Sequence, residues 1–286
     1  MTRKTVARSL AVVSFLFAGW LAYTQAPPSQ LKINKVKEDL YEIEGDGGNV
    51  AVYITSEGVI LVDDKFDADH DQILANIKSV TSQPVKYILS THYHQDHSGG
   101  NGKFLGTAQI ISTQQARLNI LNKVQSNMAA PDVQPATITF NDEMSVFLGG
   151  KEVRAKFYGR GHTNTDAVIY FPALKVVHTG DLMSGNTPLI DYPGGGSVIE
   201  WTKTLDKVLS SLDFDTVIPG HGAVTTKASL QEYRNMVEKL RTRAQGLVRG
   251  GKSADELFQV MATEFNWKKG SLQEQWSLQG LMKELK

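Results

Sequence analysis

The stretch Thr91 to Gly100, which reads THYHQDHSGG, sets four potential metal ligands within six residues. They are His92, His94, Asp96 and His97, and the whole chain has only seven histidines. Imidazole and carboxylate groups are the ligands that a borderline cation such as Zn²⁺ prefers, and a turn can aim several of them at one point. The apolar run before it, Val85 to Ser90, predicts a short buried strand. A lone histidine would ordinarily be a core or solvated residue, but this density of ligand-type residues at a strand end indicates a metal site.

Four more short segments end in, or surround, a histidine or an aspartate: Val59 to Asp63, Gly161 to Thr163, Gly180-Asp181 and Gly220 to Gly222. Together with the HxHxDH pattern at His92 to His97, they resemble in order the motifs of the metallo-beta-lactamase superfamily. The resemblance covers roughly residues 31 to 225.

The resemblance implies a set of ligands for two metal ions. One ion would be held by His92, His94 and His162, and the other by Asp96, His97 and His221. Asp181 would bridge the two ions with separate carboxylate oxygens.

Three further residues complete the expectation for the site. The resemblance implies that Asp63, at the end of its strand, lies beside a metal histidine, where it could fix the ring tautomer by accepting the outer N–H. His70 and His178 match no ligand position, so we expect both to be structural, although His178 lies close enough to Asp181 in sequence to act beside a ligand.

Residues 1–26 have the composition of an export signal. Three basic residues, Arg3, Lys4 and Arg8, precede an apolar run from Leu10 to Tyr23, and Ala26 ends a small-residue cleavage site. The run of 14 residues is short for a bilayer span, which favours a cleaved leader over an uncleaved anchor. We therefore expect a periplasmic or secreted protein with no membrane contact after cleavage.

The charge balance excludes some partners. Thirty basic residues stand against 30 acidic ones, and loss of the leader would leave 27 against 30. This near-neutral balance gives no reason to expect a nucleic-acid or membrane-surface partner. The family resemblance implies a small-molecule substrate as the partner. The chain has no cysteine, so stability must come from the core and from bound metal. The oligomeric state stays open.

The hydrophobic patterns predict two halves that each contain strands and helices. The first half reads as a strand meander over 31–62, a helix over 67–80 and a strand over 85–90. The second has a helix over 113–125, a loop over 126–134, strands at 136–140, 145–148, 152–158, 167–171 and 176–178, a helix over 198–212 and a strand over 216–218. This order fits the fold that the resemblance implies, an α/β (α+β) four-layer αβ/βα sandwich of two mixed sheets flanked by helices.

Helical patterns occupy the rest of the chain, at 230–248, 254–265 and 272–285, with a Gly250-Gly251 break. We expect three parts: a signal peptide (1–26), a catalytic domain of metallo-beta-lactamase fold (27–226), and a C-terminal helical extension packed on the same domain (227–286). The extension would cover a sheet face or contribute to substrate binding.

The chemistry that the resemblance implies depends on the metals. Two Zn²⁺ ions, or iron or manganese at a site with this many oxygens, would lower the pKa of a bound water toward ~7 and so supply a hydroxide nucleophile. Asp96 could orient the water or accept its proton as a catalytic residue. The sequence has no GxSxG motif that would indicate a serine nucleophile instead.

Asp181 also bears on the substrate. The family that the chain resembles hydrolyses β-lactams, lactones, thioesters and phosphodiesters, and its zinc β-lactamases usually have cysteine or serine where Asp181 stands. An aspartate is the pattern of lactonase-like, glyoxalase-like and other non-lactamase members. Because the run Leu182 to Gly185 directly after Asp181 has no lysine, a substrate anion would need Arg160, Ser184 or backbone N–H groups. The loop 185–196 either borders the site, with Asn186 and Tyr192 at the substrate, or only connects to the next helix.

The leading hypothesis is an exported dinuclear zinc hydrolase that opens a cyclic amide or ester, a β-lactam or a lactone. A thioesterase or phosphodiesterase of the same superfamily is the second hypothesis. A non-catalytic metal-binding protein is the third, and intact ligands at all seven positions argue against it.

Overall fold

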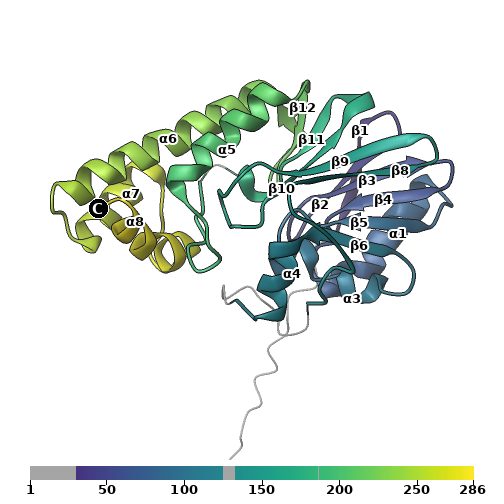
Figure 1. Ribbon diagram of the computed structural model, residues 1–286, viewed down its shortest axis with the longest axis horizontal. Coiled ribbons are helices and arrows are strands. Elements are labelled where there is room, and N and C mark those ends of the chain that lie inside the picture. The colour runs from purple at the N-terminus through teal and green to yellow at the C-terminus, as the bar shows by residue number, and fades with distance from the viewer. Residues whose placement is uncertain (1–29, 125–132, 186) are drawn as a thin grey trace, which may run out of the picture.

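Two mixed β-sheets pack face to face, and helices cover their outer faces (Figure 1). The computed structural model describes residues 30–124, 133–185 and 187–286. The expected signal peptide, all but the last two residues of the expected loop 126–134, and Asn186 lie outside the described residues. Among the helices within those ranges, none is both long and apolar enough to cross a membrane.

The first sheet has seven strands in chain order. Its first four strands form an antiparallel meander, and from β4 onward each strand runs parallel to the next. The strands are β1 (Lys32–Lys37), β2 (Leu40–Glu44), β3 (Val50–Thr55), β4 (Gly58–Val62), β5 (Val85–Leu89), β6 (Gln109–Thr113) and β7 (Ile138–Phe140).

The second sheet has six strands in the order β13-β12-β11-β10-β9-β8. Only β11 and β12 are parallel neighbours. The strands are β8 (Glu143–Leu148), β9 (Lys151–Phe157), β10 (Ala167–Phe171), β11 (Val176–His178), β12 (Thr216–Ile218) and β13 (Thr225–Thr226).

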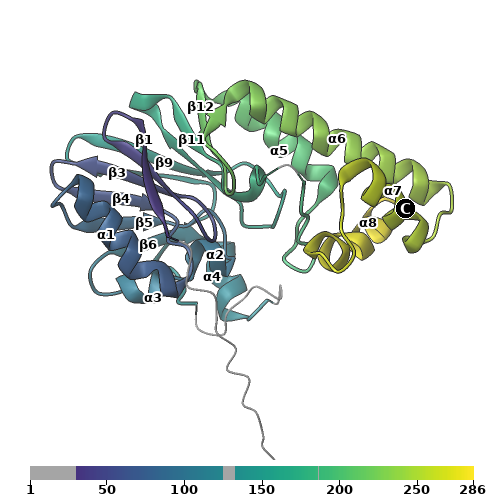
Figure 2. The same cartoon turned by 180° about the vertical axis from the view of Figure 1, so that it is seen from behind.

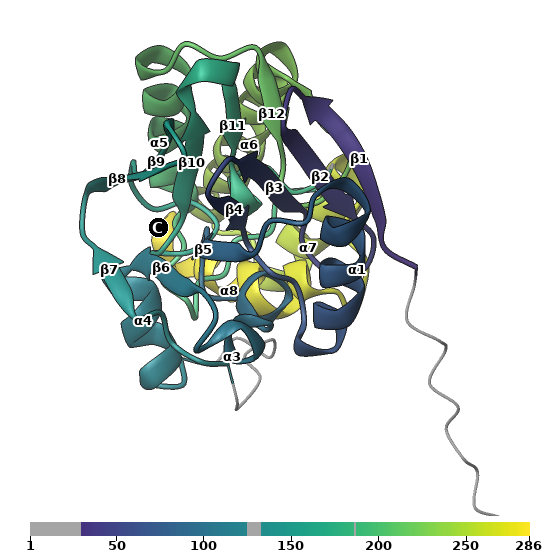
Figure 3. The same cartoon turned by 90° about the vertical axis from the view of Figure 1, so that its right-hand side faces the viewer.

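Figure 3 shows helices on both sides of the paired sheets, α1, α3 and α4 on one side and α5 and α6 on the other. The helices are α1 (His70–Val80), α2 (Gln95–Ser98), α3 (Asn101–Phe104), α4 (Gln114–Leu121), α5 (Val198–Ser211), α6 (Lys227–Arg249), α7 (Ala254–Phe265) and α8 (Leu278–Glu284). Single 3₁₀ turns lie at Asp67–Asp69, Pro172–Leu174 and Gly180–Leu182, and a π-helical turn, Gln273–Ser277, precedes α8. Figures 1 and 2 show α6, α7 and α8 gathered at the end of the molecule opposite α1.

Three hydrophobic clusters fill the spaces between the layers. One lies between α1 and the outer face of the first sheet, and includes Ile73 and Ile77 of the helix. A second fills the space between the sheets, where the rings of Tyr53 and Phe171 meet edge to face at 5.2 Å. The third joins the outer face of the second sheet to α5 and the C-terminal helices. The arrangement confirms the four-layer αβ/βα sandwich.

Local differences from the sequence patterns are few. The patterns do not predict β6, because its two buried isoleucines stand beside polar residues and show no clear period. The expected helix over 113–125 begins after Thr113, whose side chain caps it, and α4 ends at Leu121. The last expected helix starts with the π-helical turn, which places Trp276 and Ser277 in the interior.

The strand ends place the candidate ligands at one edge of the sandwich. Parallel pairing aligns Val62 of β4 with Leu89 of β5, so Asp63 and the His92 segment leave the first sheet side by side. His178 of β11 is aligned with Ile218 of β12 in the second sheet, so the Asp181 and His221 turns also leave it together.

Candidate metal centre

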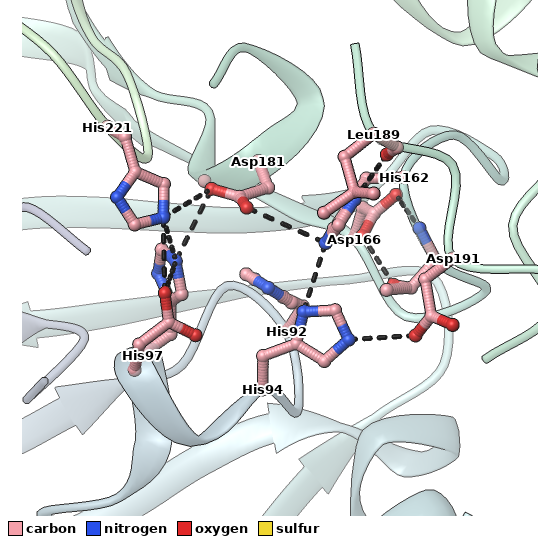
Figure 4. A network of polar contacts seen from close by, with 12 residues as sticks. His92, His94, His97, His162, Asp166, Asp181, Leu189, Asp191 and His221 are labelled. Atoms are coloured by element: carbon pink, nitrogen blue, oxygen red, sulfur yellow. Dashed lines mark hydrogen bonds and ion pairs between the residues drawn. The ribbon is translucent and has the colours of Figure 1, made fainter. Parts of the chain in front are cut away.

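Seven side chains from four segments of the chain meet at this edge (Figure 4). They form three overlapping groups whose ligand atoms lie within 4.8 Å of one another: His92, His94 and His162; His92, His97 and Asp181; and Asp96, His97 and His221. Each group offers the nitrogen and oxygen donors that suit a divalent transition-metal ion. The structure therefore brings together all of the ligands expected from the sequence.

The first group consists of three buried imidazoles. His94 Nδ1 lies 3.0 Å from His162 Nε2. The ring centre of His92 lies 4.7 Å from that of His94 and 5.1 Å from that of His162. Three facing imidazoles form the protein donor set of a zinc site that keeps a fourth position open.

The group of Asp96, His97 and His221 combines two imidazoles with a carboxylate. His97 Nε2 lies 3.3 Å from His221 Nε2, and Asp96 Oδ2 lies 3.2 Å from His221 Nε2. Asp181 lies between the groups. Its Oδ1 is 3.3 Å from His97 Nε2, while its Oδ2 is 3.6 Å from His162 Nε2. The two oxygens of one carboxylate thus face different groups.

Asp63 lies behind two of the histidines. Its Oδ2 is 2.8 Å from His97 Nδ1 and accepts a hydrogen bond from the Thr91 hydroxyl, while its Oδ1 accepts from the Thr91 backbone N–H. The Thr91 oxygen lies 3.1 Å from His92 Nδ1 and can accept its proton in turn. Both rings then carry hydrogen on Nδ1, which leaves the Nε2 lone pairs facing the centre.

The other two buried rings have different outer partners. Asp191 Oδ2 lies 2.8 Å from His94 Nε2 and also accepts a 2.6 Å hydrogen bond from the Tyr93 hydroxyl. This contact assigns the proton to Nε2, so His94 presents Nδ1 to the centre. The backbone carbonyl of Leu189 lies 2.7 Å from His162 Nδ1 and leaves its Nε2 facing inward. All four buried histidines of the cluster are thereby oriented with one ring nitrogen directed inward.

Three inward-facing atoms have no hydrogen-bond partner within the described part of the chain: His92 Nε2, Asp96 Oδ1 and Asp181 Oδ1. Burying a polar atom without a partner costs about 1–3 kcal/mol. Cations held between the groups would satisfy His92 Nε2 and Asp181 Oδ1. The residues present therefore fit a centre of two divalent ions, and the mixed nitrogen and oxygen donors suit zinc, iron or manganese.

The pKa values of the histidines are shifted in opposite directions at the two ends of the cluster. Burial lowers the pKa of His92 and of His162, so both rings are neutral at pH 7. Burial also lowers the pKa of His97, but the carboxylates of Asp96 and Asp181 outweigh it and hold that pKa well above its usual range. The pKa of His221 is raised in the same way, with Asp181 outweighing burial.

The carboxylates respond in the opposite sense. Burial raises the pKa of Asp96, but His97 and His221 outweigh it and lower the pKa to about 2. The same two histidines hold the pKa of Asp181 well below its usual range despite burial. Protonated His97 and His221 thus balance the two carboxylates in the metal-free protein, and cations would replace those protons.

Asn49 fixes the turn that carries His221. Its backbone N–H donates to Gly220 O at 2.7 Å, and its side-chain amide donates to the carbonyls of Pro219 and Gly222. Gly220 cannot be replaced without a shift, because a Cβ there would lie 2.0 Å from Asp181 Oδ1. The turn from the second sheet is thereby held by a residue of the first.

The cluster is open to solvent beside His221. Its side chain is 34% exposed, whereas those of Asp96 and Asp181 are 7% and 6% exposed. A cavity of about 390 Å³ lies next to this ring, between the loops at Met183 and Gly222 and helix α6. A substrate can therefore approach from this side.

The expected substrate contacts have mixed positions. The guanidinium of Arg160 makes a two-pronged ion pair with Glu200, at 2.6 and 3.1 Å. The hydroxyl of Tyr192 donates to Glu284 in α8 at 2.6 Å. Ser184 forms a β-bridge with His221 and lies beside the centre. Asn186 is outside the described residues. Of these four, Ser184 is the one that the structure sets next to a ligand.

The two remaining histidines lie apart from the ligand groups. His70 begins α1 and its ring contacts Phe104. His178 is fully buried, where its Nε2 lies 3.0 Å from Asn49 O and its Nδ1 accepts from Gly180 N. His178 thus links the two sheets beneath the centre.

Sequence reasoning missed three residues that act on the site. Asp191 is the only charged residue between Asp181 and Glu200, a signal that could have drawn attention to it. Asp166 accepts hydrogen bonds from the backbone N–H and the hydroxyl of Thr163 and so holds the His162 turn. Trp276, whose ring centre lies 5.6 Å from that of His94, has no local sequence signal, because it is distant in the chain.

A family model, that of the metallo-beta-lactamase superfamily, matches residues 43–221, which include every residue of the cluster. The chain belongs to this superfamily. Membership supports a metallo-hydrolase, and it agrees with the His and Asp groups found at the centre.

Curated relatives in the superfamily are β-lactamases of modest identity. A metallo-beta-lactamase type 2 of Elizabethkingia meningoseptica is 26% identical over 246 residues, which cover 80% of this chain and 93% of that protein. One of Bacteroides fragilis is 27% identical over 190 residues, 64% of this chain and 73% of that protein.

Solved metallo-beta-lactamases share the fold. The enzyme from Pontibacter korlensis superposes with a TM-score of 0.64 at 19% identity, covering 73% of this chain and 99% of its own. The DIM-1 metallo-beta-lactamase gives 0.63 at 23% identity, covering 75% of this chain and 99% of its own. These structures cover about three quarters of this chain, while nearly all of each solved chain is matched.

Proposed function

We propose that this chain is an exported hydrolase that holds two zinc ions at the cluster and opens a cyclic amide or ester. The ligands are His92, His94 and His162 for one ion and Asp96, His97 and His221 for the other, with Asp181 shared. Lactones are the leading substrates and β-lactams come second.

The position of Asp181 carries the proposal. Its Oδ1 faces His97 and His221, at 3.3 and 3.5 Å, and its Oδ2 faces His162. A carboxylate between two donor groups can hold a cation with each oxygen, and its charge offsets part of theirs.

The chain's own residues prepare the reaction. Bound cations would polarise the substrate carbonyl and make a water molecule nucleophilic at neutral pH. Asp96, whose pKa is lowered to about 2, stays ionised and has a buried Oδ1 free to accept a hydrogen bond from that water. A carboxylate with so low a pKa is a weak base, which favours orienting the water over removing its proton.

Two features favour a lactone over a β-lactam. β-Lactam antibiotics carry a carboxylate, which needs a cationic partner. The segment 182–202, directly after Asp181, contains no lysine, and Glu200 already pairs with Arg160. An uncharged ring ester needs no cationic partner, and an aspartate at position 181 is the pattern of lactonase-like, glyoxalase-like and other non-lactamase members.

The test combines metal content with turnover. Protein purified without added metal is analysed for bound elements and then assayed on a lactone, nitrocefin, a thioester and bis-nitrophenyl phosphate. We expect about two ions per chain and the highest turnover on the lactone. Turnover confined to the thioester or the phosphodiester would assign a different hydrolase activity, and bound metal without any turnover would favour a non-catalytic protein.

Export is part of the proposal. It is supported by the basic and apolar residues of the first 26 positions. N-terminal sequencing of protein recovered from the periplasm or the medium should begin near Pro27. A cytoplasmic product that retains Met1 would contradict export without affecting the metal site.

A further inference from the structure

The C-terminal helices lie beyond the part of the chain that matches the superfamily. The family match ends at His221, whereas α6, α7 and α8 span residues from Lys227 to Glu284. They share one hydrophobic cluster with α5 and the second sheet, to which Leu230, Leu257 and Leu281 contribute. This cluster explains how the helices are attached. It does not explain why the π-helical turn before α8 reaches the metal centre.

We propose that the C-terminal helices are part of the active site, in which Trp276, Ser277 and Glu284 act as positioning residues for His94. They act through the loop of residues 189–197, called here the Asp191 loop. The inference rests on the proposed metal binding.

Ser277 holds the start of the Asp191 loop. It is fully buried, accepts a hydrogen bond from Ile190 N at 3.0 Å and donates one to Ile190 O at 2.9 Å. One hydroxyl therefore satisfies both backbone groups of the residue directly before Asp191. This pairing requires the π-helical turn, which faces Ser277 inward.

Glu284 holds the other end of the loop. Its carboxylate accepts a hydrogen bond from the Tyr192 hydroxyl at 2.6 Å, from Val198 N at 3.1 Å and from the Ser197 hydroxyl. Helix α8 also packs directly on the ring of Tyr192, because a Cβ at Gly280 would lie 1.9 Å from Tyr192 Cδ2. The residues on both sides of Asp191 are thus fixed by the C-terminal helices.

Asp191 connects the loop to the metal centre. Its carboxylate lies 2.8 Å from His94 Nε2, and its backbone N–H donates to His162 O at 2.9 Å. Trp276 adds a direct contact, since its buried ring packs beside the His94 ring at 5.6 Å between centres. His94 is therefore held on one side by the loop and on another by the indole.

The two metal groups depend on different supports. His97 is oriented by Asp63, and the His221 turn by Asn49, both from the first sheet. Loss of the C-terminal contacts should therefore weaken only the ion held by His92, His94 and His162. Outer partners of metal-binding histidines typically change metal affinity by about 10- to 100-fold, which sets the expected size.

The experiment compares Trp276→Leu with a matched variant, Trp267→Leu. Trp267, which follows α7, is also a buried indole, at 2% exposure, and within the described residues its ring meets no histidine ring. The stepwise affinities of the full-length protein for two Zn²⁺ ions are measured by competitive titration, together with the melting temperature. We expect Trp276→Leu to weaken one of the two affinities about 10-fold or more. Trp267→Leu should lower the melting temperature and leave both affinities unchanged.

A second pair of substitutions keeps the test valid if an indole variant does not fold. Glu284→Gln removes the charge that holds Tyr192 and Val198, and its matched variant Glu264→Gln breaks an exposed ion pair with Arg243. Only Glu284→Gln should weaken the same Zn²⁺ step, by several-fold. Trp276→Phe, which keeps an aromatic ring, should restore most of the affinity lost in Trp276→Leu.

Each outcome has one meaning. Wild-type affinities for both ions in folded Trp276→Leu and Glu284→Gln protein would overturn the positioning role, as would an equal loss in the matched variants. Selective weakening of one ion without hydrolysis of any substrate would support the positioning role and refute only the hydrolase. A wild-type protein that binds no metal would overturn both proposals.

Discussion

At the scale of single residues, the site depends on which oxygen or nitrogen each side chain turns inward. Asp181 faces two groups at once, and the four buried histidines are each held by an outer acceptor. The acceptors differ in kind: a carboxylate for His97 and His94, a hydroxyl for His92 and a backbone carbonyl for His162. The orientation of each ring is therefore set before any cation binds.

Replacing Asp181 by serine should remove the carboxylate that we propose the two ions share. The substitution removes one negative charge and both facing oxygens, so at least one ion should bind more weakly and lactone turnover should fall by more than about 10-fold, or about 1.4 kcal/mol. Any β-lactam hydrolysis should fall less or rise, because space is freed at the centre. Kinetics and metal content are measured on the same samples, with Asp206→Ser, an exposed carboxylate paired with Arg234, as the control. Unchanged metal content and rates would show that Asp181 is not a ligand.

The pH dependence of metal binding should differ between the two groups. The pKa values of His97 and His221 are raised, so a cation there must displace protons, and the affinity should fall as the pH falls from about 8 to about 6. The pKa values of His92 and His162 are lowered, so their lone pairs stay free and the other ion should change little over this range. Calorimetry in two buffers of different ionisation enthalpy counts the protons released at each step. Equal proton release at both steps would contradict the assignment.

At the scale of elements, the centre forms where loops from both sheets meet. The first sheet supplies the His92 to His97 segment and Asp63, and the second supplies Asp181 and His221. Asn49, just before β3, crosses to the second sheet and holds the 219–222 turn through three hydrogen bonds. The relative position of the two halves of the ligand set therefore depends on a few cross-sheet contacts.

Asn49→Ala should loosen the His221 turn. Loss of two side-chain hydrogen bonds at a buried position should cost about 1–3 kcal/mol of unfolding free energy. The affinity for the ion at Asp96, His97 and His221 should fall several-fold, while the other affinity stays unchanged, the reverse of the pattern expected for Trp276→Leu. Asn76→Ala is the control, because that amide bonds only within the surface helix α1. An equal loss of both ions in Asn49→Ala would mean that the two groups are not supported separately.

At the scale of the whole molecule, the hydrophobic clusters and the metal centre are largely distinct. The three clusters lie between layers, whereas the centre lies at one edge. The fold therefore does not need the ions to form its core.

Metal removal should leave a folded protein. Chelation should lower the melting temperature, because ions bound only by the native state add stability by mass action. It should leave the far-UV circular dichroism spectrum intact and abolish hydrolysis. Returned Zn²⁺ should restore both the melting temperature and activity. Loss of secondary structure on chelation would show instead that the core depends on the centre.

The sequence by itself determined the ligand types, their order and the sandwich. Ligand residues are dense at His92 to His97, so the local pattern indicates a metal site there, and the resemblance to the superfamily implies the ligands at His162, Asp181 and His221. The periods of strands and helices predict the elements, because period depends on neighbours in the chain, whereas the four layers were implied by the resemblance. The sequence patterns did not predict β6 or the π-helical turn, since their conformation depends on the elements packed around them.

Only the tertiary structure decided how the ligands are oriented and what supports them. Asp191 reaches His94 across 97 positions of the chain, and Glu284 reaches Tyr192 across 92. Arg160, which the sequence suggests as a partner for a substrate anion, instead forms an ion pair with Glu200. Such pairings carry no local period or motif, because a hydrogen bond between distant segments exists only after the layers have packed. The sequence therefore identifies the atoms that can bind metal, and the packed chain determines which lone pairs face it.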